Sequence, residues 1–282
     1  MLFLAPERTT MSADNLYVHG THPEEQARLT RLNALLNEGS LRELGARAGE
    51  RMLDVGSGLG QFARAVAKIT GVPVVGVERS AEQIAESARQ ARGAGEERLI
   101  DLRCGDAQHL PLEDDEWATF DIAHARFLLE HVREPLEIVK GMVRAVRPGG
   151  RVVLEDDDHD VLRLWPEPPG LADVWRAYMR AYDRAGNDPI SGRRLVQLLH
   201  QAGAEPKRCT WIFFGACAGH ADFELYVENL ALILEGARDA IVATGIGRDE
   251  LCNALAQLRE WKRRPDAAFW FAMSWAEGVR PG

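Results

Sequence analysis

Three alternating glycines follow an acidic residue at the end of the first apolar segment. Asp54 precedes Gly56, Gly58 and Gly60, which gives the spacing D-x-G-x-G-x-G. Glycine tolerates positive φ and has no Cβ, so the backbone amides of such a turn can contact carboxylate, ribose or phosphate oxygens directly. A dinucleotide-binding loop, G-x-G-x-x-G, needs its third glycine where Gln61 stands here. The spacing therefore favours a different nucleotide-like ligand.

A second acidic residue, Glu78, ends the next β-branched segment, Val72–Val77. A carboxylate has two acceptor oxygens and can bind both hydroxyls of a ribose. Ser80 and Gln83 then have the spacing of a capping box, which predicts that a helix begins there. Glu78 is therefore expected to lie beside the start of a helix and to accept ribose hydroxyls.

Two further predicted strands also end at polar residues. Leu99–Cys104 leads into Gly105-Asp106-Ala107, and Phe120–Ala123 leads into His124-Ala125-Arg126. Ligands of open α/β sheets bind outside the carboxyl ends of the strands. All four strand ends are therefore expected to share one site.

The order of these motifs resembles that of class I S-adenosylmethionine-dependent methyltransferases. The resemblance covers Arg51 to Glu155 and is strongest to the small-molecule branch, which includes quinone-pathway and secondary-metabolite enzymes. Two strings typical of that branch are Phe127-Leu128-Leu129-Glu130-His131 and Arg147-Pro148-Gly149-Gly150, the second of which breaks the chain before a predicted strand, Val152–Glu155. The resemblance implies transfer of a methyl group from S-adenosylmethionine to an oxygen, carbon or nitrogen atom of a small organic molecule by in-line displacement, leaving S-adenosylhomocysteine.

The resemblance also implies roles for individual residues. The backbone of Gly56 and Gly58 would hold the methionine part of the cofactor, Glu78 the ribose, and Asp106 with Ala107 the adenine edge, while Arg126 would form the floor beneath the sulfonium. The full predicted cofactor-binding set is Tyr17, Arg28, Asp54, Gly56, Ser57, Gly58, Gly60, Gln61, Glu78, Arg79, Gln83, Gly105, Asp106, Ala107, Ala125 and Arg126.

The N-terminal part of that set depends on a leading amphipathic helix, Pro23–Leu36. In the family such a helix tends to lie over the cofactor, which would bring Tyr17, His19 and Arg28 to the methionine carboxylate. A surface helix with solvated charges is the alternative.

A general base is needed only if the acceptor must lose a proton, because the methyl group is already activated by the sulfonium. His124, at a strand end, and His131 are the candidates. For His131 the alternative is a helix residue bonded to a neighbouring loop.

An acidic run, Glu155-Asp156-Asp157-Asp158-His159-Asp160, follows the fifth strand. It could hold Mg²⁺ or a cationic amine acceptor, but consecutive strand residues point to alternate sides, so few of these carboxylates can converge. We therefore predict a solvated acidic loop and no bound metal.

The rest of the chain also alternates between predicted strands and predicted helices. The resemblance implies an α/β, Rossmann-like, seven-stranded doubly wound sheet of order 3-2-1-4-5-7-6 with the last strand antiparallel, preceded by a helical segment and carrying a helical insertion between strands 6 and 7. The later predicted elements are helices Gly170–Ala185 and Arg193–Ala202, strand Cys209–Phe214, helices Phe223–Val242 and Arg248–Lys262, and strand Ala267–Trp275.

This pattern suggests an organisation in three parts. We expect a disordered extension over 1–13, a helical cover over 14–48, and a methyltransferase domain over 49–282 in which 220–265 form a lid or a homodimer surface. Six aromatic residues could line an apolar pocket or pack as core: Trp165, Trp175, Tyr178, Tyr182, Phe223 and Tyr226.

Composition limits the partners. The 282-residue chain has a net charge of -9, the wrong sign for binding nucleic acid mainly through phosphates, and no stretch approaches the roughly 20 apolar residues of a membrane span. Four cysteines without C-x-x-C spacing suggest reduced thiols and a cytoplasmic protein. The alternatives are a non-catalytic cofactor-binding protein or partner subunit, and a nicotinamide-dependent dehydrogenase, which Gln61 disfavours.

Overall fold

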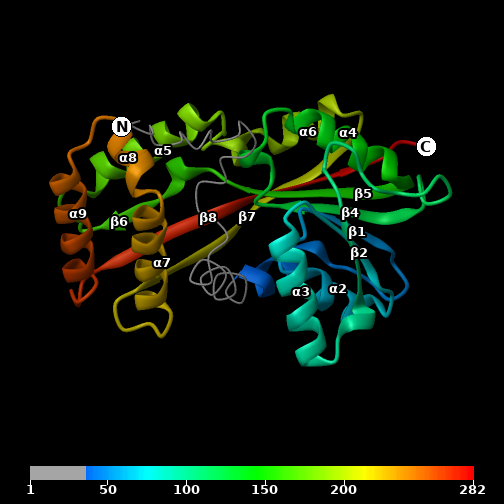
Figure 1. Ribbon diagram of the computed structural model, residues 1–282, viewed down its shortest axis with the longest axis horizontal. Helices are drawn as coiled ribbons and strands as arrows, with labels where there is room; N and C mark the ends of the chain where they lie inside the picture. Colours follow the sequence, from blue (N-terminus) through cyan, green and yellow to red (C-terminus); the bar gives the residue numbers. More distant parts are fainter. Residues whose placement is uncertain (1–35) are drawn as a thin grey trace, which may run out of the picture.

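A mostly parallel sheet organises the chain. The computed structural model describes residues 36–282 (Figure 1). Its 8-stranded sheet has the order β3-β2-β1-β4-β5-β8-β6, and β7 pairs with β8 outside this path. The strands are β1 (Met52–Val55), β2 (Val74–Glu78), β3 (Ile100–Cys104), β4 (Phe120–Arg126), β5 (Val146–Asp157), β6 (Arg163–Trp165), β7 (Glu205–Cys217) and β8 (Ala268–Val279).

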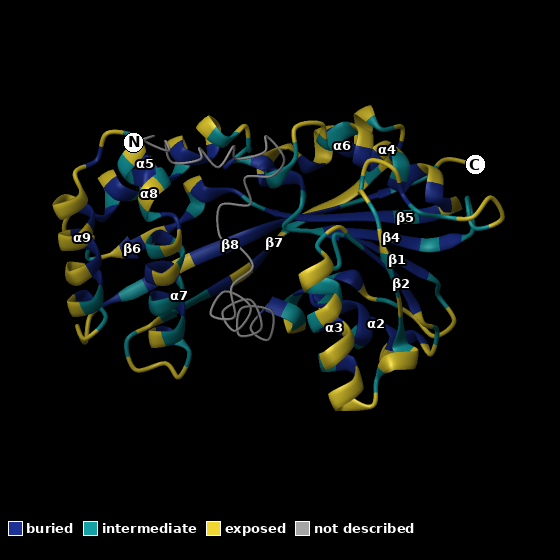
Figure 2. Ribbon diagram, viewed as in Figure 1, coloured by how far each residue is buried: buried dark blue, intermediate teal, exposed yellow. Residues whose placement is uncertain are grey.

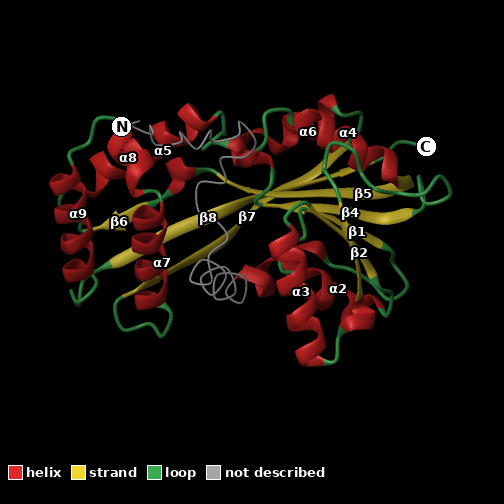
Figure 3. Ribbon diagram, viewed as in Figure 1, coloured by secondary structure: helices red, strands yellow, loops and turns green. Residues whose placement is uncertain are grey.

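Helices connect the parallel strands and cover both faces of the sheet (Figure 3). Residues 36–44 are also helical. The other helices are α2 (Gln61–Thr70), α3 (Ala81–Ala94), α4 (Pro135–Ala145), α5 (Leu171–Ala185), α6 (Leu195–Gln201), α7 (Phe223–Gly236), α8 (Arg238–Ala243) and α9 (Arg248–Trp261), with short 3₁₀ helices η1 (Glu97–Leu99), η2 (Leu129–His131), η3 (His159–Val161) and η4 (Ser191–Arg194).

Alternation of side chains along the strands divides the core in two (Figure 2). In β1, Met52 belongs to the core cluster that contains Phe62 of α2 and continues to the buried residues of α5, α7 and α9. Its neighbour Leu53 belongs to the other cluster, which contains buried residues of α4 and α6 such as Met142 and Leu199. The strands are therefore apolar on both faces, as buried parallel strands are.

Strand β8 belongs to two parts of the molecule. Its residues 273–279 pair antiparallel with β5, whereas its residues 268–270 extend past the carboxyl end of β5 and pair with β6. Helices α5, α7, α8 and α9 gather at that far end, beyond the carboxyl ends of the parallel strands (Figure 1). Strand β7 pairs with β8 along this whole length, so the two strands together extend from the parallel sheet into the helical region.

The predicted sheet order is confirmed, with β8 and β7 in the places expected for the seventh and sixth strands. The helical insertion between them is also present, as α7, α8 and α9. The short strand β6 was not predicted. The prediction of a single helix over Phe223–Val242 is wrong, because the chain forms two helices there, α7 and α8, with a break at Ala237.

One predicted boundary is also wrong. Strand β5 begins at Val146, before the Pro-Gly-Gly string, because Val146 pairs with Phe120 and the amide of Gly149 donates to the carbonyl oxygen of Arg280. The helix over residues 36–44 was not predicted beyond Leu36. Most of the predicted leading helix, with Tyr17, His19 and Arg28, lies outside the described residues.

Candidate functional site

The glycine turn after β1 has the left-handed backbone that its sequence requires. Gly56, Gly58 and Gly60 have φ angles of 74°, 53° and 64°. A Cβ on Gly56 would lie 3.2 Å from Cδ1 of Leu128, and one on Gly58 would lie 3.2 Å from Oε1 of Gln83. Any other residue at these positions would be strained, so the turn keeps its backbone open towards the carboxyl end of the sheet.

The carboxylate of Glu78 lies against this turn. Its Oε2 accepts a hydrogen bond from the amide of Gly58 at 3.0 Å, and its Oε1 accepts from the amides of Arg79 and Ser80, both at 2.8 Å. Ser80 caps α3 through a bond from the amide of Gln83 to its Oγ. The predicted capping box position therefore fixes the start of α3 directly beside Glu78.

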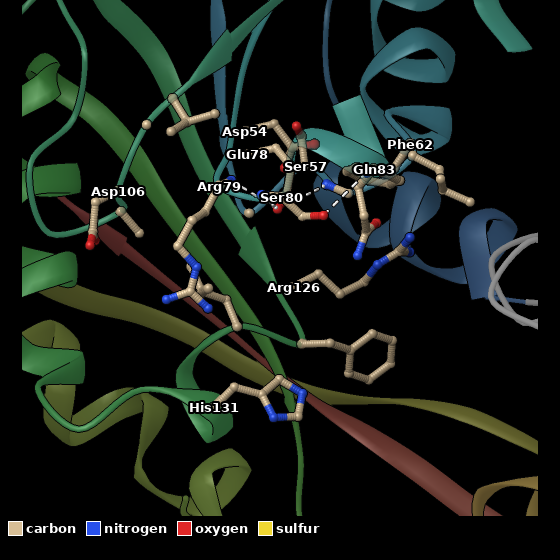
Figure 4. A pocket seen from close by; sticks show the side chains of 18 of the residues that line it. Asp54, Ser57, Phe62, Glu78, Arg79, Ser80, Gln83, Asp106, Arg126 and His131 are labelled. Carbon is tan, nitrogen blue, oxygen red and sulfur yellow. Dashed lines mark hydrogen bonds between the residues drawn. The ribbon is translucent and has the colours of Figure 1, made fainter. Parts of the chain in front are cut away.

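The turn and Glu78 form one wall of a cavity of about 530 Å³. This volume is in the range of small-molecule sites. Figure 4 shows Glu78, Ser80 and Gln83 on one side and His131 on the other. The cavity is lined by Asp54, Gly56, Ser57, Gly58, Leu59, Gln61, Phe62, Val77, Glu78, Arg79, Ser80, Ala81, Glu82, Gln83, Gly105, Asp106, Ala107, His124, Arg126, Phe127, Leu128, His131 and Val132.

Most of the predicted site residues come together here, and two do not. Gly60 is absent from the lining, and a Cβ there would lie 2.7 Å from Oγ of Ser87, so this glycine permits close packing of α3 instead. Ala125 points to the opposite side of β4 and is buried in the core with α4 and α6. Tyr17 and Arg28 lie outside the described residues. Gly60 and Ala125, both predicted to bind the cofactor, therefore do not line this cavity.

Several lining residues were not predicted. Phe62 faces the cavity from the first turn of α2, and its ring lies 4.8 Å from the guanidinium carbon of Arg126. Phe127 has a φ of 52°, a left-handed conformation that a bulky residue rarely adopts. The sequence carries no signal for that backbone, because the conformation arises from the sharp exit of the chain from β4.

Arg126 connects the cavity to the helical residues 36–44. Its guanidinium donates to Oδ1 of Asn37 at 3.0 Å and to Oγ of Ser40 at 3.3 Å. Ser40 in turn donates to Oε2 of Glu155 at 2.6 Å. The arginine predicted as a cavity floor is therefore held by a segment that precedes the sheet.

His124 is held between two buried carboxylates. Its Nδ1 lies 2.7 Å from Oδ1 of Asp54, and its Nε2 lies 3.3 Å from Oε1 of Glu155 without the alignment of a hydrogen bond. Burial alone would lower the pKa of His124, but Asp54 and Glu155 raise it to about 9. The ring is therefore protonated at neutral pH, which disfavours it as a base.

His131 has the opposite electrostatic environment. Burial, and then the positive charge of Arg79, lower the pKa of His131 to about 4, so the ring is neutral. It lies in η2 and lines the cavity, with Nε2 3.3 Å from Oε1 of Glu130. Of the two predicted bases, only His131 combines a neutral ring with a place in the wall of the cavity.

The acidic run after β5 is not a solvated loop, so that prediction is wrong. Glu155 and Asp156 are fully buried in the sheet, and Asp158 is buried and bonded to Arg193. Oδ2 of Asp156 accepts from the amides of Leu129 and Glu130, and its Oδ1 from that of Asp157. The run stays buried because it continues the central strand β5, whose end the helical region covers.

Of the two alternatives for the six aromatic residues, packing as core holds for all except Trp165. Tyr178, Tyr182 and Phe223 are almost fully buried. Trp175 stacks on Tyr178 with ring centroids 5.1 Å apart, and Trp165 is 68% exposed. None of the six predicted aromatic residues lines the cavity described above.

Two observations concern the predictions that the chain has no membrane span and that its cysteines are reduced. Within residues 36–282, no helix combines the length and apolar character that crossing a membrane requires. All four cysteines are free thiols on the surface.

Known proteins resemble this chain in sequence and in fold. A family model described as a methyltransferase domain matches residues 53–154. The chain is 34% identical over 168 residues to an uncharacterised 37.1 kDa protein in transposon TN4556 of Streptomyces fradiae, an alignment that covers 58% of this chain and 46% of that protein. It is 31% identical over 195 residues to the 27-O-demethylrifamycin SV methyltransferase of Amycolatopsis mediterranei, covering 69% of this chain and 68% of that enzyme.

The fold is also similar to that of a solved structure. A solved structure of geranyl diphosphate methyltransferase in complex with SAM superposes with a TM-score of 0.55 at 16% identity, covering 90% of this chain and 88% of that one. The chain spans about half the length of the first relative in sequence and about two thirds of the second.

Proposed function

The chain belongs to the class I S-adenosylmethionine-dependent methyltransferases, and from this membership we propose that it transfers a methyl group from that cofactor to an oxygen, carbon or nitrogen atom of a small organic molecule. The observation that supports the proposal best is the contact between Glu78 and the glycine turn, because it places a carboxylate and open backbone amides on one wall of the cavity.

The residues present fit the cofactor. Ser57 lines the cavity, and its buried Oγ has no hydrogen-bond partner among the described residues. The backbone of Gly56 and Gly58 would hold the methionine part, Glu78 the ribose hydroxyls, and Asp106 with Ala107 the adenine edge. Arg126 would lie beneath the sulfonium.

The cofactor supplies a methyl group already activated by a positive sulfonium. The task of this chain is then to align the acceptor atom with that methyl group and to exclude water. We assign His131, on the wall opposite Glu78, as the group that accepts a proton when the acceptor carries one. His124 serves instead to neutralise the two buried carboxylates beside it.

The helical region would select the acceptor. The helices within 220–265 lie beyond the carboxyl ends of the parallel strands, which supports their assignment as a lid rather than as a homodimer surface (Figure 1). Light scattering on the full chain tests the homodimer alternative. The acidic net charge of -9 supports a small molecule over nucleic acid as acceptor, and the free surface cysteines support a cytoplasmic location.

Isothermal titration calorimetry with S-adenosylhomocysteine tests the cofactor assignment. We expect one site per chain with micromolar affinity, and absence of binding at millimolar ligand would overturn the assignment. Mass spectrometry of a metabolite library incubated with the chain and S-adenosylmethionine then identifies the acceptor. Cofactor binding without any methylated product would favour a non-catalytic binding protein.

A further inference from the structure

Three potential metal ligands converge at the end of β5, outside the cavity. Glu130 comes from η2, Asp157 from the last position of β5, and His159 from η3. One ligand atom from each lies within 4.8 Å of the other two. Nε2 of His159 is 3.5 Å from Oε2 of Glu130 and 3.9 Å from Oδ2 of Asp157, distances at or beyond the limit of a direct hydrogen bond. We call these three residues the Glu130 cluster.

Each residue of the Glu130 cluster carries a buried polar atom without a hydrogen-bond partner among residues 36–282. The side chains of Glu130 and His159 are each 4% exposed. The atoms without a partner in this part of the chain are Oε2 of Glu130, Oδ1 of Asp157 and Nδ1 of His159. Burying an unbonded carboxylate costs several kcal/mol, so such groups in proteins are normally paired or bind a metal.

No lysine or arginine neutralises these two carboxylates within residues 36–282. Among the described residues, Glu130 forms ion-pair contacts only with His131 and His159, and Asp157 only with His159. Arg193, which is close by, is bound to Asp158 and Asp160. The two carboxylates therefore face one another and a histidine, an arrangement that a cation would neutralise.

We propose that Glu130, Asp157 and His159 bind one divalent transition-metal ion, of which Zn²⁺ and Mn²⁺ are the representatives. Bonds of about 2.0–2.2 Å to nitrogen and oxygen place neighbouring ligand atoms about 3–4 Å apart, as observed here. An imidazole ligand favours a transition metal over Mg²⁺ and Ca²⁺, which prefer oxygen. Two ligands, Asp157 and His159, come from the acidic run, and they are two residues apart, so the divergence of successive strand residues does not separate them.

The ion would act structurally. None of its ligands lines the cavity, and together they join η2, the end of β5 and η3. The side chain of Asp157 is 18% exposed, which provides an entry path for the ion and a place for a water ligand. The same region carries Trp175 and Tyr178, whose rings pack on His159 at 5.3 and 5.4 Å and hold its imidazole in place.

Metal titration of the untagged full chain tests the proposal. After dialysis against EDTA, we expect one Mn²⁺ per chain by electron paramagnetic resonance and one Zn²⁺ by calorimetry, both with micromolar or lower dissociation constants, and at least tenfold weaker binding of Mg²⁺. Asp157→Asn and His159→Gln should each weaken Zn²⁺ binding at least tenfold. Asp160→Asn is the matched control, because it removes an exposed acid of the same segment and should leave the affinity unchanged.

Three outcomes would overturn the proposal. They are no binding of Zn²⁺ or Mn²⁺ up to 1 mM, equal affinity in wild type and Asp157→Asn, and a thermal shift with tetramethylammonium but none with metal, which would indicate an ammonium pocket. If the variants fail to fold, Co²⁺ binding to the wild type tests the proposal. Co²⁺ should give ligand-field absorption bands and raise the melting temperature of the EDTA-treated chain. Affinity for S-adenosylhomocysteine should change less than twofold on metal removal, so a failed metal test and a failed cofactor test are distinguishable.

Discussion

Asp54 and His124 are direct register partners on the adjacent parallel strands β1 and β4, and the His124 ring donates to the Asp54 carboxylate across 2.7 Å. The side chains of both residues are at most 5% exposed. The first acidic residue of the glycine-rich motif thus has a partner in the protein itself, a histidine at the end of β4. This buried charged contact therefore joins β1 to β4 in the wall of the cavity.

Replacing Asp54 by asparagine should weaken the sheet. The amide keeps the size of the side chain but removes the charge opposite His124, and breaking a buried pair costs about 3–5 kcal/mol. We expect the urea unfolding midpoint of Asp54→Asn to fall, and the pKa of His124 measured by NMR to fall by at least one unit. Asp121→Asn is the control, since Asp121 pairs with Arg147 nearer the surface; an equal loss there would contradict the prediction.

The stability of the wild type should decrease as the solution becomes alkaline. The folded pKa of His124, about 9, lies above its ordinary value of 6.5, so the folded state holds the proton more tightly than the unfolded state. This stabilisation is complete below pH 6.5 and is lost as the pH rises through about 9, and it amounts to something on the order of 3 kcal/mol. Urea unfolding at intervals from pH 6 to about 10 measures it. A profile that is flat over this interval would show that His124 is neutral in the folded protein.

Glu78→Gln should reduce the affinity for S-adenosylhomocysteine about 10- to 100-fold, because hydrogen bonds to a charged acceptor contribute roughly 1.5–3 kcal/mol. The control is Glu82→Gln, a second acid in the lining of the same cavity that lies in the first turn of α3. Calorimetry on both variants separates a specific contact from a general effect of charge. Equal losses in the two variants would refute a specific role for Glu78.

Gly56→Ala and Gly71→Ala form a second matched pair. Both glycines are left-handed, with φ angles of 74° and 73°, so alanine should cost each variant about 1–2 kcal/mol of stability. A Cβ on Gly71 would meet no atom within 4 Å, whereas one on Gly56 would enter the cavity wall against Leu128. Only Gly56→Ala should therefore lose cofactor binding, and retained binding in that variant would exclude close backbone contact.

His131→Asn should lower kcat for a proton-bearing acceptor by about 100-fold or more while changing the affinity for S-adenosylhomocysteine little. His200→Asn, an exposed histidine on α6, is the control. Steady-state kinetics with the acceptor found by mass spectrometry gives the comparison. An unchanged kcat in His131→Asn would leave the alignment of the acceptor as the main contribution of the protein.

The sequence predicted the parts of the site that depend on local rules. The glycine turn, Glu78 and the Ser80 cap each follow from spacing along one strand-to-helix connection, and the structure has them where the pattern indicated. The sheet order followed from resemblance and was also confirmed.

The errors arose where distant segments meet. Ala125 was predicted to bind the cofactor together with its neighbours in sequence, but it does not line the cavity, because adjacent strand residues face opposite sides. The acidic run was predicted to be solvated because its composition is polar, yet its surroundings come from η2, α5 and η4. No local pattern shows that Glu130 and Asp157 meet.

The late position of β8 in the sequence affects how the chain folds during its synthesis. Strand β5 ends at Asp157 and its partner does not begin until Ala268. On the ribosome, β5 can pair with β4 on one edge, but its other edge stays open until the whole helical insertion has been synthesised. An exposed edge of this kind is a template for wrong pairing between nascent chains. The arrangement makes the yield of native protein sensitive to translation speed and to chaperones that shield β5, independently of the stability of the finished fold.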